Sequence, residues 1–139
     1  MIIIEGTDAV GKTTTINELK KENIICEDRS KDVISKYMLF DYTTEYRSKI
    51  YHEYLKSNDC LIIFLINNDK EELLRRVYQR EIIGDYDLEA YEYNKLYQET
   101  YEYMKKNDML ENKLFLVDAT DLTLEEQVNK VKETIICQV

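Results

Sequence analysis

The chain is poor in basic residues, in glycine and in long apolar runs. Lys and Arg together number 19 against 28 for Asp and Glu, which gives a formal net charge of -9. That balance disfavours a DNA- or RNA-binding protein, because such proteins present basic surface to phosphates. The apolar runs are no longer than a strand, so the sequence predicts no membrane span, and an apolar start leaves no room for a targeting segment. We therefore expect a cytoplasmic protein.

Cysteine and histidine are too few and too dispersed to indicate a metal site. The three cysteines are an odd number and lie far apart in apolar stretches, and His52 is the only histidine. No pair of these residues has the spacing of zinc ligands. The sequence instead predicts free, buried thiols in a reducing compartment at Cys26, Cys60 and Cys137.

The length of 139 residues suits one domain with a substantial core, predicted to span residues 1–139. Four short runs are apolar throughout rather than alternating, which is typical of parallel strands buried on both faces. These predicted strands are Ile2–Glu5, Ile24–Asp28, Leu61–Ile66 and Leu114–Asp118.

Helical patterns separate the predicted strands. We expect helices over 12–21, 70–82 and 88–107, two helices within 30–57 with a break near 41–44, and a last helix over 123–137. Thr123 and Glu126 form a capping box at the start of the last one. The alternation predicts an α/β fold, a P-loop NTPase-type three-layer sandwich in which helices flank a small, mostly parallel sheet of about four strands. Ligands of such sheets bind beyond the carboxyl ends of the strands.

The segment Gly6–Thr13, directly after the first strand, has the pattern of a phosphate-binding loop. Successive backbone N–H groups in a tight loop that opens onto a helix N-terminus bind phosphate groups. Gly6 and Gly11 permit the backbone angles and the close approach, Lys12 reaches the β- and γ-phosphates, and Thr13 is the expected Mg²⁺ ligand. We predict ATP and Mg²⁺ as cofactors, with ATP bound by Gly6, Thr7, Asp8, Ala9, Val10, Gly11, Lys12, Thr13 and Thr14.

Other classes of P-loop protein fit the sequence less well. A GTPase needs Asn-Lys-x-Asp after a strand, and Asn67-Asn68-Asp69-Lys70 has these letters in the wrong order. A motor or large ATPase domain needs a longer chain. Small nucleotide kinases remain.

Several segments resemble the thymidylate kinase family, in the order in which that family has them. Glu5–Thr14 is similar to the family's Glu-Gly-x-Asp/Glu-x-x-Gly-Lys-Thr-Thr start, and Asp28-Arg29 follows an apolar strand as its Asp-Arg pair does. Tyr37 is similar to the family's downstream tyrosine, and Asp59–Ile66 with Glu71–Arg80 is similar to the strand and helix that lead into its lid. Tyr93, Tyr97 and Tyr101 have the aromatic spacing of the helix after the lid, and Val117–Thr120 is similar to the loop that borders adenine. The match covers most of the chain.

The resemblance implies a nucleoside monophosphate kinase that transfers the ATP γ-phosphate to a (deoxy)nucleotide, with a lid region around 76–90. The resemblance assigns catalysis to Lys12, Asp8, Arg29, Arg76 and Arg80. It assigns magnesium binding to Thr13 and, through water, to Asp28. Arg29 and Tyr37 would bind the acceptor, and Thr120 would border the adenine of ATP. The residue patterns also allow Asp28 as a helix cap, Arg29 in a surface ion pair, Asp8 as a solvated carboxylate, Arg76 and Arg80 as a solvated helix face, and Tyr37 in the core. The tyrosines at 93, 97 and 101 are expected to pack in the core.

The chain departs from the family in being shorter. The helix over 12–21 runs almost directly into Asp28, so the segment that usually lines the acceptor base is absent. Two other kinase activities therefore stay open, on a deoxynucleoside or on a polynucleotide 5′-hydroxyl, as does a nucleotide-binding module that has lost catalysis. We expect a small-molecule acceptor, with nucleic acid disfavoured by the acidic balance and no membrane partner. A homodimer is one way in which so short a chain completes its site.

Overall fold

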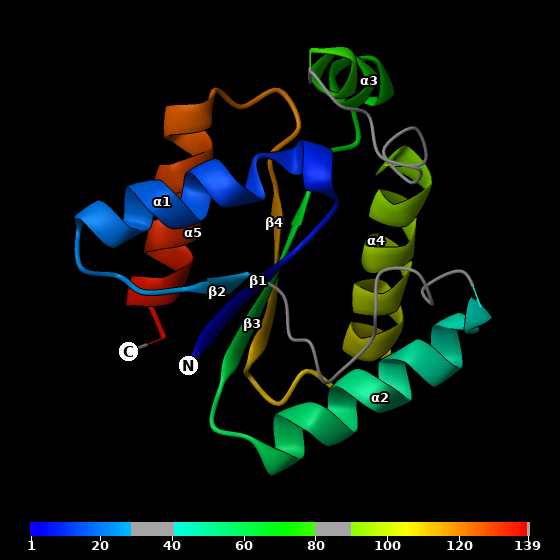
Figure 1. The fold of residues 1–139 in the computed structure, drawn as a ribbon. Coiled ribbons are helices and arrows are strands. Elements are labelled where there is room, and N and C mark those ends of the chain that lie inside the picture. Colours follow the sequence, from blue (N-terminus) through cyan, green and yellow to red (C-terminus); the bar gives the residue numbers. More distant parts are fainter. Residues whose placement is uncertain (29–40, 80–89, 139) are drawn as a thin grey trace.

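The computed structural model describes residues 1–28, 41–79 and 90–138, with only the backbone of Asp8. These residues form four strands, five α-helices and one 3₁₀ helix (Figure 1). In chain order they are β1 (Ile2–Glu5), η1 (Asp8–Val10), α1 (Lys12–Lys21), β2 (Glu27–Asp28), α2 (Thr44–Ser57), β3 (Leu61–Ile66), α3 (Lys70–Tyr78), α4 (Ala90–Lys106), β4 (Leu114–Asp118) and α5 (Leu124–Ile136).

All four strands pair in parallel, in the order β2-β1-β3-β4. The chain leaves β1 toward β2 on one side and leaves β3 toward β4 on the other. The strand order therefore reverses between β1 and β3, and ligands of open α/β sheets bind at the carboxyl ends on either side of such a reversal. The phosphate-binding loop predicted from the sequence follows β1 directly at this point.

Helices cover both faces of the sheet, which makes the fold a three-layer α/β sandwich. Figure 1 shows α1 and α5 on one side of the strands and α2 and α4 on the other. Alternate strand residues face the two layers, since Ile3 and Phe64 belong to the core cluster with α2 and α4, whereas Ile4 and Ile63 belong to the cluster with α1 and α5. Burial on both faces explains why these strands read as continuous apolar runs. The predicted fold class is confirmed.

Most predicted elements lie where the sequence placed them. β1, β3, β4 and α1 have the predicted bounds, and α5 is one residue shorter than predicted at each end. α4 is described from Ala90 and ends one residue before the predicted end at 107. α3 ends at Tyr78, with Gln79 as its C-cap, before the predicted end at 82. The break before α2 is marked by Thr43, whose side chain accepts a hydrogen bond from the Tyr46 N–H over 3.1 Å. The capping box of α5 is present. The predicted helix within 30–40 lies outside the described residues.

The predicted strand Ile24–Asp28 is too long, because only Glu27 and Asp28 pair with β1. Asn23 has a positive φ of 64°, and the Ile24 N–H donates to the Leu19 carbonyl over 3.0 Å. Ile24 is therefore part of the turn that ends α1, and its apolar side chain packs against the core from there.

The tyrosine prediction is confirmed, but the cysteine prediction is partly wrong. Tyr93 and Tyr97 are buried in the core beside α2 and β3, and Tyr101 packs against the same cluster. Cys26 and Cys60 are buried free thiols as predicted, whereas Cys137 is free but exposed because it follows the last turn of α5.

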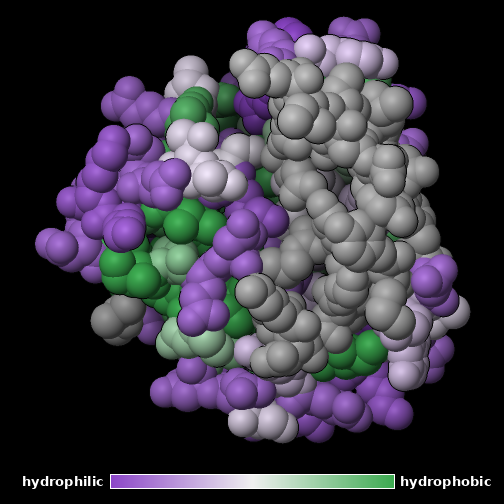
Figure 2. All heavy atoms as spheres, in the orientation of Figure 1, coloured by the Kyte–Doolittle hydropathy of each residue, from purple (hydrophilic) through white to green (hydrophobic). Residues whose placement is uncertain are grey.

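The surface is mainly polar, with a few exposed apolar side chains. The green area at the left of Figure 2 marks apolar residues on the side of α1, β2 and α5. The large hydrophobic residues most exposed to solvent are Ile25, Tyr78, Ile136 and Met1. None of the described helices is both long and apolar enough to cross a membrane.

Candidate phosphate-binding site

The loop between β1 and α1 depends on its two glycines for different reasons. A Cβ on Gly6 would lie 2.5 Å from the Leu65 carbonyl oxygen of β3, so only glycine allows this close approach of backbones. Gly11 has φ +86°, in the left-handed region that favours glycine. Between them Asp8–Val10 form a single 3₁₀ turn. The glycine roles predicted from the sequence are confirmed.

Helix α1 begins at this loop with a free N-terminus. Gly11 is its N-cap, no side chain of the described residues caps it, and its first turn contains no acidic residue. Each of the other four described α-helices has at least one acid in its first turn. The N–H groups and the positive end of the helix dipole are thus left for an external anion.

Lys12 is buried at the mouth of this loop. Its residue is 4% exposed, and its Nζ lies 3.3 Å from the Gly6 carbonyl oxygen and 2.9 Å from the Asp28 carboxylate. Asp28 comes from the end of the neighbouring strand β2, and its side chain is 54% exposed. Asp28, which the sequence predicts to bind magnesium through water, therefore lies at the loop, where it forms an ion pair with Lys12.

Arg76 reaches the same loop from α3. Its Nη1 donates to the Ala9 carbonyl over 3.3 Å, and its Nε donates to Glu72 over 3.0 Å. Arg75 binds the same carboxylate over 2.8 Å but is more exposed. Hydrogen bonds from Arg75, and then from Arg76, lower the pKa of Glu72 to about 2, so this acid is ionised at neutral pH. Leu73 and Val77 on the other side of α3 are buried, which turns the arginines outward.

A cavity of about 400 Å³ lies over the loop and is lined by both sets of residues. Of the side chains described, three basic residues, Lys12, Arg75 and Arg76, line it together with one carboxylate, Glu72. Thr13 and Thr14 are exposed at its base, where α1 begins. The cavity therefore combines backbone donors, hydroxyls and cations, which is the chemistry that a polyphosphate requires.

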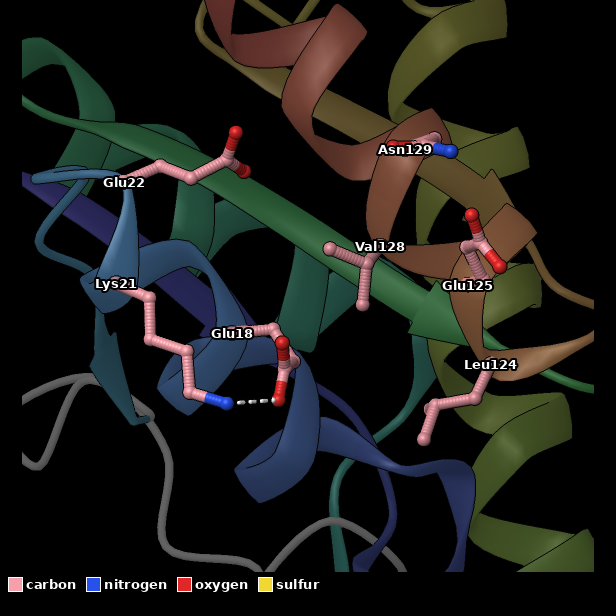
Figure 3. Close-up of a pocket in the computed structure, with 7 residues that line it drawn as sticks. All are labelled: Glu18, Lys21, Glu22, Leu124, Glu125, Val128 and Asn129. Atoms are coloured by element: carbon pink, nitrogen blue, oxygen red, sulfur yellow. Dashed lines mark hydrogen bonds and ion pairs between the residues drawn. The ribbon is translucent and has the colours of Figure 1, made fainter.

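A larger cavity, of about 480 Å³, is unsuited to phosphate. It lies between α1 and α5, and Figure 3 shows Glu18 and Glu22 on one wall with Glu125 on the other. Its one lysine, Lys21, is paired with Glu18 over 2.8 Å. Carboxylates in such number repel an anionic ligand.

The residues of this site also fit a magnesium ion. Thr13 offers a hydroxyl at the base of the cavity and Asp28 offers a carboxylate beside Lys12. Among residues 1–28, 41–79 and 90–138, no group of three or more His, Cys, Asp or Glu side chains could hold a metal by itself. Mg²⁺ is commonly held by one or two protein oxygens together with substrate phosphates and water, so this donor set is adequate.

Several residues predicted to belong to the site are not described by the structure or do not line the cavity. Arg29, Tyr37 and Arg80, the lid from residue 80 onward and the side chain of Asp8 lie outside the described residues. Thr120 is described, but it does not line the cavity. Its hydroxyl accepts from the Asn68 N–H over 2.9 Å and donates to Asp118, so it fastens the loop after β3 to the loop after β4. Its predicted contact with ATP stays a prediction.

The sequence did not predict two buried polar contacts, one to the loop after β1 and one to the loop after β3. Gln127 of α5 is 1% exposed and donates to the Val10 carbonyl over 3.0 Å. Asn94 of α4 accepts from the Asn67 N–H over 2.7 Å and donates to Asn68, which fixes the loop after β3. No local pattern marks either contact, because each joins helices and loops far apart in sequence.

The partner of the arginines was also missed, although a local pattern could have found it. Glu72 lies four residues before Arg76 on α3, the spacing of a helical ion pair. Asp69 with Glu72 three residues later also marks the start of that helix, and the Asp69 side chain accepts from the Glu72 N–H over 3.1 Å.

Glu5 and Tyr51 join the opposite layer to the end of β1. The Tyr51 hydroxyl donates a short hydrogen bond to the Glu5 carboxylate, and both residues are fully buried. Glu5 thus points away from α1, toward α2, and its neighbour along the chain is Gly6. The Glu5 carboxylate therefore anchors the start of the loop to the α2 layer.

A comparison with protein-family models and one with curated proteins found no match to this chain. The resemblance to thymidylate kinases rests on the residues quoted above and stays a prediction.

Proposed function

We propose that this chain is an ATP-dependent nucleoside monophosphate kinase of the thymidylate kinase type. The observation that carries the proposal is the cavity in which the loop after β1, the buried Lys12 and Arg76 of α3 meet. Phosphoryl transfer needs positioning and charge neutralisation more than covalent help from the protein. This cavity offers both from two elements that are far apart in the sequence.

The donor side is built from the loop and the start of α1. The N–H groups of the loop and of the first turn would bind the β- and γ-phosphates, with Lys12 beside them. Thr13 would bind Mg²⁺ through its hydroxyl. ATP supplies the phosphoryl group, and magnesium neutralises part of its charge.

Lys12 has to exchange partners when a phosphate arrives. Its ammonium group is held by Asp28 and by the Gly6 carbonyl. A phosphate that takes over Lys12 frees the Asp28 carboxylate for a magnesium-bound water. This exchange reconciles the ion pair seen in the structure with the magnesium role predicted for Asp28.

Arg76 is the candidate for stabilising the transferring phosphoryl group. It enters the cavity from α3 and is 24% exposed, while Glu72 holds its guanidinium in place. A cation positioned in advance where negative charge develops lowers the barrier without reorganisation. Arg80, the second predicted lid arginine, would act from the lid.

The acceptor is proposed from the resemblance to thymidylate kinases, as a (deoxy)nucleotide bound by Arg29 and Tyr37. A nucleoside or a polynucleotide 5′-hydroxyl is the alternative acceptor within the kinase class. The homodimer and the cytoplasmic location stay predictions.

The test is a phosphotransfer assay with ATP and Mg²⁺ against a panel of acceptors. The panel holds the nucleosides, their monophosphates and a 5′-hydroxyl oligonucleotide, and both ADP and the phosphorylated product are followed. We expect ADP formation that depends on one monophosphate. Lys12→Ala should lower kcat/KM by a factor of about 100 or more. Lys20→Ala, on the exposed part of the same helix, should leave it unchanged.

A second pair of variants tests the contribution of α3. Arg76→Ala should lower kcat by a factor of roughly 100, because its interaction is strongest in the transition state. Arg75→Ala should lower it much less, since this side chain is 57% exposed. Turnover with a nucleoside or the oligonucleotide alone would move the assignment within the kinase class. ATP binding with no turnover on any acceptor would contradict the kinase and favour a nucleotide-binding module.

A further inference from the structure

Gln127 of α5 is buried beside the loop and is hydrogen-bonded to one loop carbonyl and to the Thr15 hydroxyl. Its Nε2 donates to the Val10 carbonyl over 3.0 Å and to the Thr15 hydroxyl over 2.9 Å. The Thr15 hydroxyl in turn donates to the Gly11 carbonyl over 2.8 Å. One side chain therefore holds two successive peptide groups of the loop, one directly and one through Thr15.

The orientation of the Gln127 amide follows from its partners. The Val10 carbonyl can only accept, and the Thr15 hydroxyl already gives its proton to the Gly11 carbonyl. The NH₂ end must therefore face the loop, because the reversed amide would place an oxygen against these acceptors.

These hydrogen bonds decide which way the loop N–H groups point. In a trans peptide the C=O and the following N–H point in opposite directions. The Val10 carbonyl is turned toward Gln127 of α5, so the N–H group of Gly11 is turned away from it. The Gly11 carbonyl also accepts from the Thr15 N–H over 3.0 Å, so α1 itself orients the Lys12 N–H, and the Thr15 hydroxyl held by Gln127 reinforces that orientation. These are the N–H groups with which the loop and the start of α1 would meet a phosphate.

The position of Gln127 is not explained by packing alone. Its neighbours on α5, Val128 and Val131, belong to the apolar core cluster of this layer. The Gln127 Oε1 is buried without a hydrogen-bond partner among the described residues. An apolar side chain of the same length would avoid that unsatisfied oxygen. Gly11 also leaves room for it, because a Cβ there would lie 3.0 Å from Nε2.

We propose that Gln127 is a positioning residue that holds the phosphate-binding loop in its anion-binding conformation from α5. The assignment rests on the proposed function only in that the loop binds a polyphosphate. It makes α5, which supplies no residue to the phosphates themselves, a determinant of nucleotide affinity.

The test compares two variants of nearly the same length. Gln127→Met removes both donors, and Gln127→Glu replaces them with an oxygen that repels the loop carbonyls. We measure the dissociation constants of Mg-ATP and of inorganic tripolyphosphate by calorimetry, together with thermal unfolding and kcat/KM. Losing one or two hydrogen bonds to charged phosphate oxygens weakens binding by about 10- to 100-fold. We expect at least this loss for both ligands, and a larger one for Gln127→Glu.

Val131→Ala is the matched control, because Val131 is a fully buried residue of the same helix in the same apolar layer. It should lower stability and leave both dissociation constants unchanged. Thr15→Val and Thr15→Ser give a second route if the Gln127 variants do not fold. The valine removes the hydroxyl that connects Gln127 to Gly11 and should weaken binding, whereas the serine retains the hydroxyl and should restore it.

The outcomes separate this inference from the proposed function. Wild-type affinity in folded Gln127→Met, or in Thr15→Val where the Gln127 variants do not fold, would overturn the positioning role even if the enzyme transfers phosphate. Weakened binding in both series supports it, even if no acceptor is ever phosphorylated. A wild-type protein that binds neither ATP nor tripolyphosphate would overturn both.

Discussion

Replacing Gly6 by alanine tests the backbone of the loop without any ligand. The added Cβ would lie 2.5 Å from the Leu65 carbonyl oxygen and 3.0 Å from a methyl group of Val10. Real Cβ contacts essentially never fall below 3.0 Å, so the loop and β3 have to separate by at least the difference of 0.5 Å. Leu65 is fully buried in a central strand and cannot move freely.

The expected magnitude follows from what each contact can do. Forcing a methyl group into a packed interior costs about 1–3 kcal/mol, and we place Gly6→Ala near 3 kcal/mol because the opposing atom is backbone. Gly11→Ala is the comparison. Its φ of +86° disfavours alanine by about 1–2 kcal/mol, while the nearest atom, Gln127 Nε2, would lie 3.0 Å away, at the limit of real Cβ contacts rather than below it. Gly6→Ala should therefore be the more destabilising by roughly 1–2 kcal/mol.

Urea and thermal unfolding of the two variants measure this difference directly. For 139 residues the unfolding entropy is about 0.3 kcal/mol/K, so a loss of 3 kcal/mol lowers the melting temperature by about 10 °C. Gly11→Asn is a useful third variant, since asparagine tolerates the left-handed conformation better than alanine. If Gly6→Ala is no less stable than Gly11→Ala, the loop does not approach β3 as described.

Three further predictions concern the cysteines and a buried hydrogen bond. A thiol reagent should modify Cys137 at once in the native protein and should reach Cys26 and Cys60 only on unfolding, as followed by mass spectrometry. Burial raises the pKa of Cys26 from 9.0 to about 11. The contribution of the protonated thiol to stability is therefore complete below pH 9 and is lost as the pH rises through 11. Over that interval the urea midpoint of Cys26→Ala should decline less than that of the wild-type protein. Tyr51→Phe removes the hydrogen bond to the buried Glu5 and should lower the free energy of unfolding by about 1.5–3 kcal/mol; a change below 0.5 kcal/mol would contradict the anchoring role.

The fold was predictable because its elements are encoded locally. A parallel strand covered on both faces has to be largely apolar, and β1, β3 and β4 have this pattern, with an acid only at the last residue of β1 and of β4. β2 consists of the exposed acids Glu27 and Asp28, so the apolar residues just before it led to a strand that was too long. The local pattern could not show that Ile24 belongs to the turn ending α1, because that depends on the backbone of Asn23.

The candidate site was predictable in its loop and less so in its surroundings. The requirements for Gly6, Gly11 and Lys12 are set by the loop itself and are therefore visible in the sequence. Gln127 and Val10 are 117 positions apart, and their contact exists only because α5 packs against α1 on the same face of the sheet. Such contacts are set by tertiary packing, which no spacing rule contains.

The charges around the loop explain why magnesium belongs to the proposed function. Among the side chains that the structure describes, Lys12, Arg75 and Arg76 meet Asp28 and Glu72 there, which leaves one positive charge in excess. A bound ATP brings several negative charges and competes with both carboxylates for the same cations. The excess alone is too small to neutralise it at close range. A divalent ion at Thr13 reduces that deficit and also gives Asp28 a new partner. A metal-bound nucleotide can thus rearrange the ion pairs of Lys12 with Asp28 and of the arginines with Glu72.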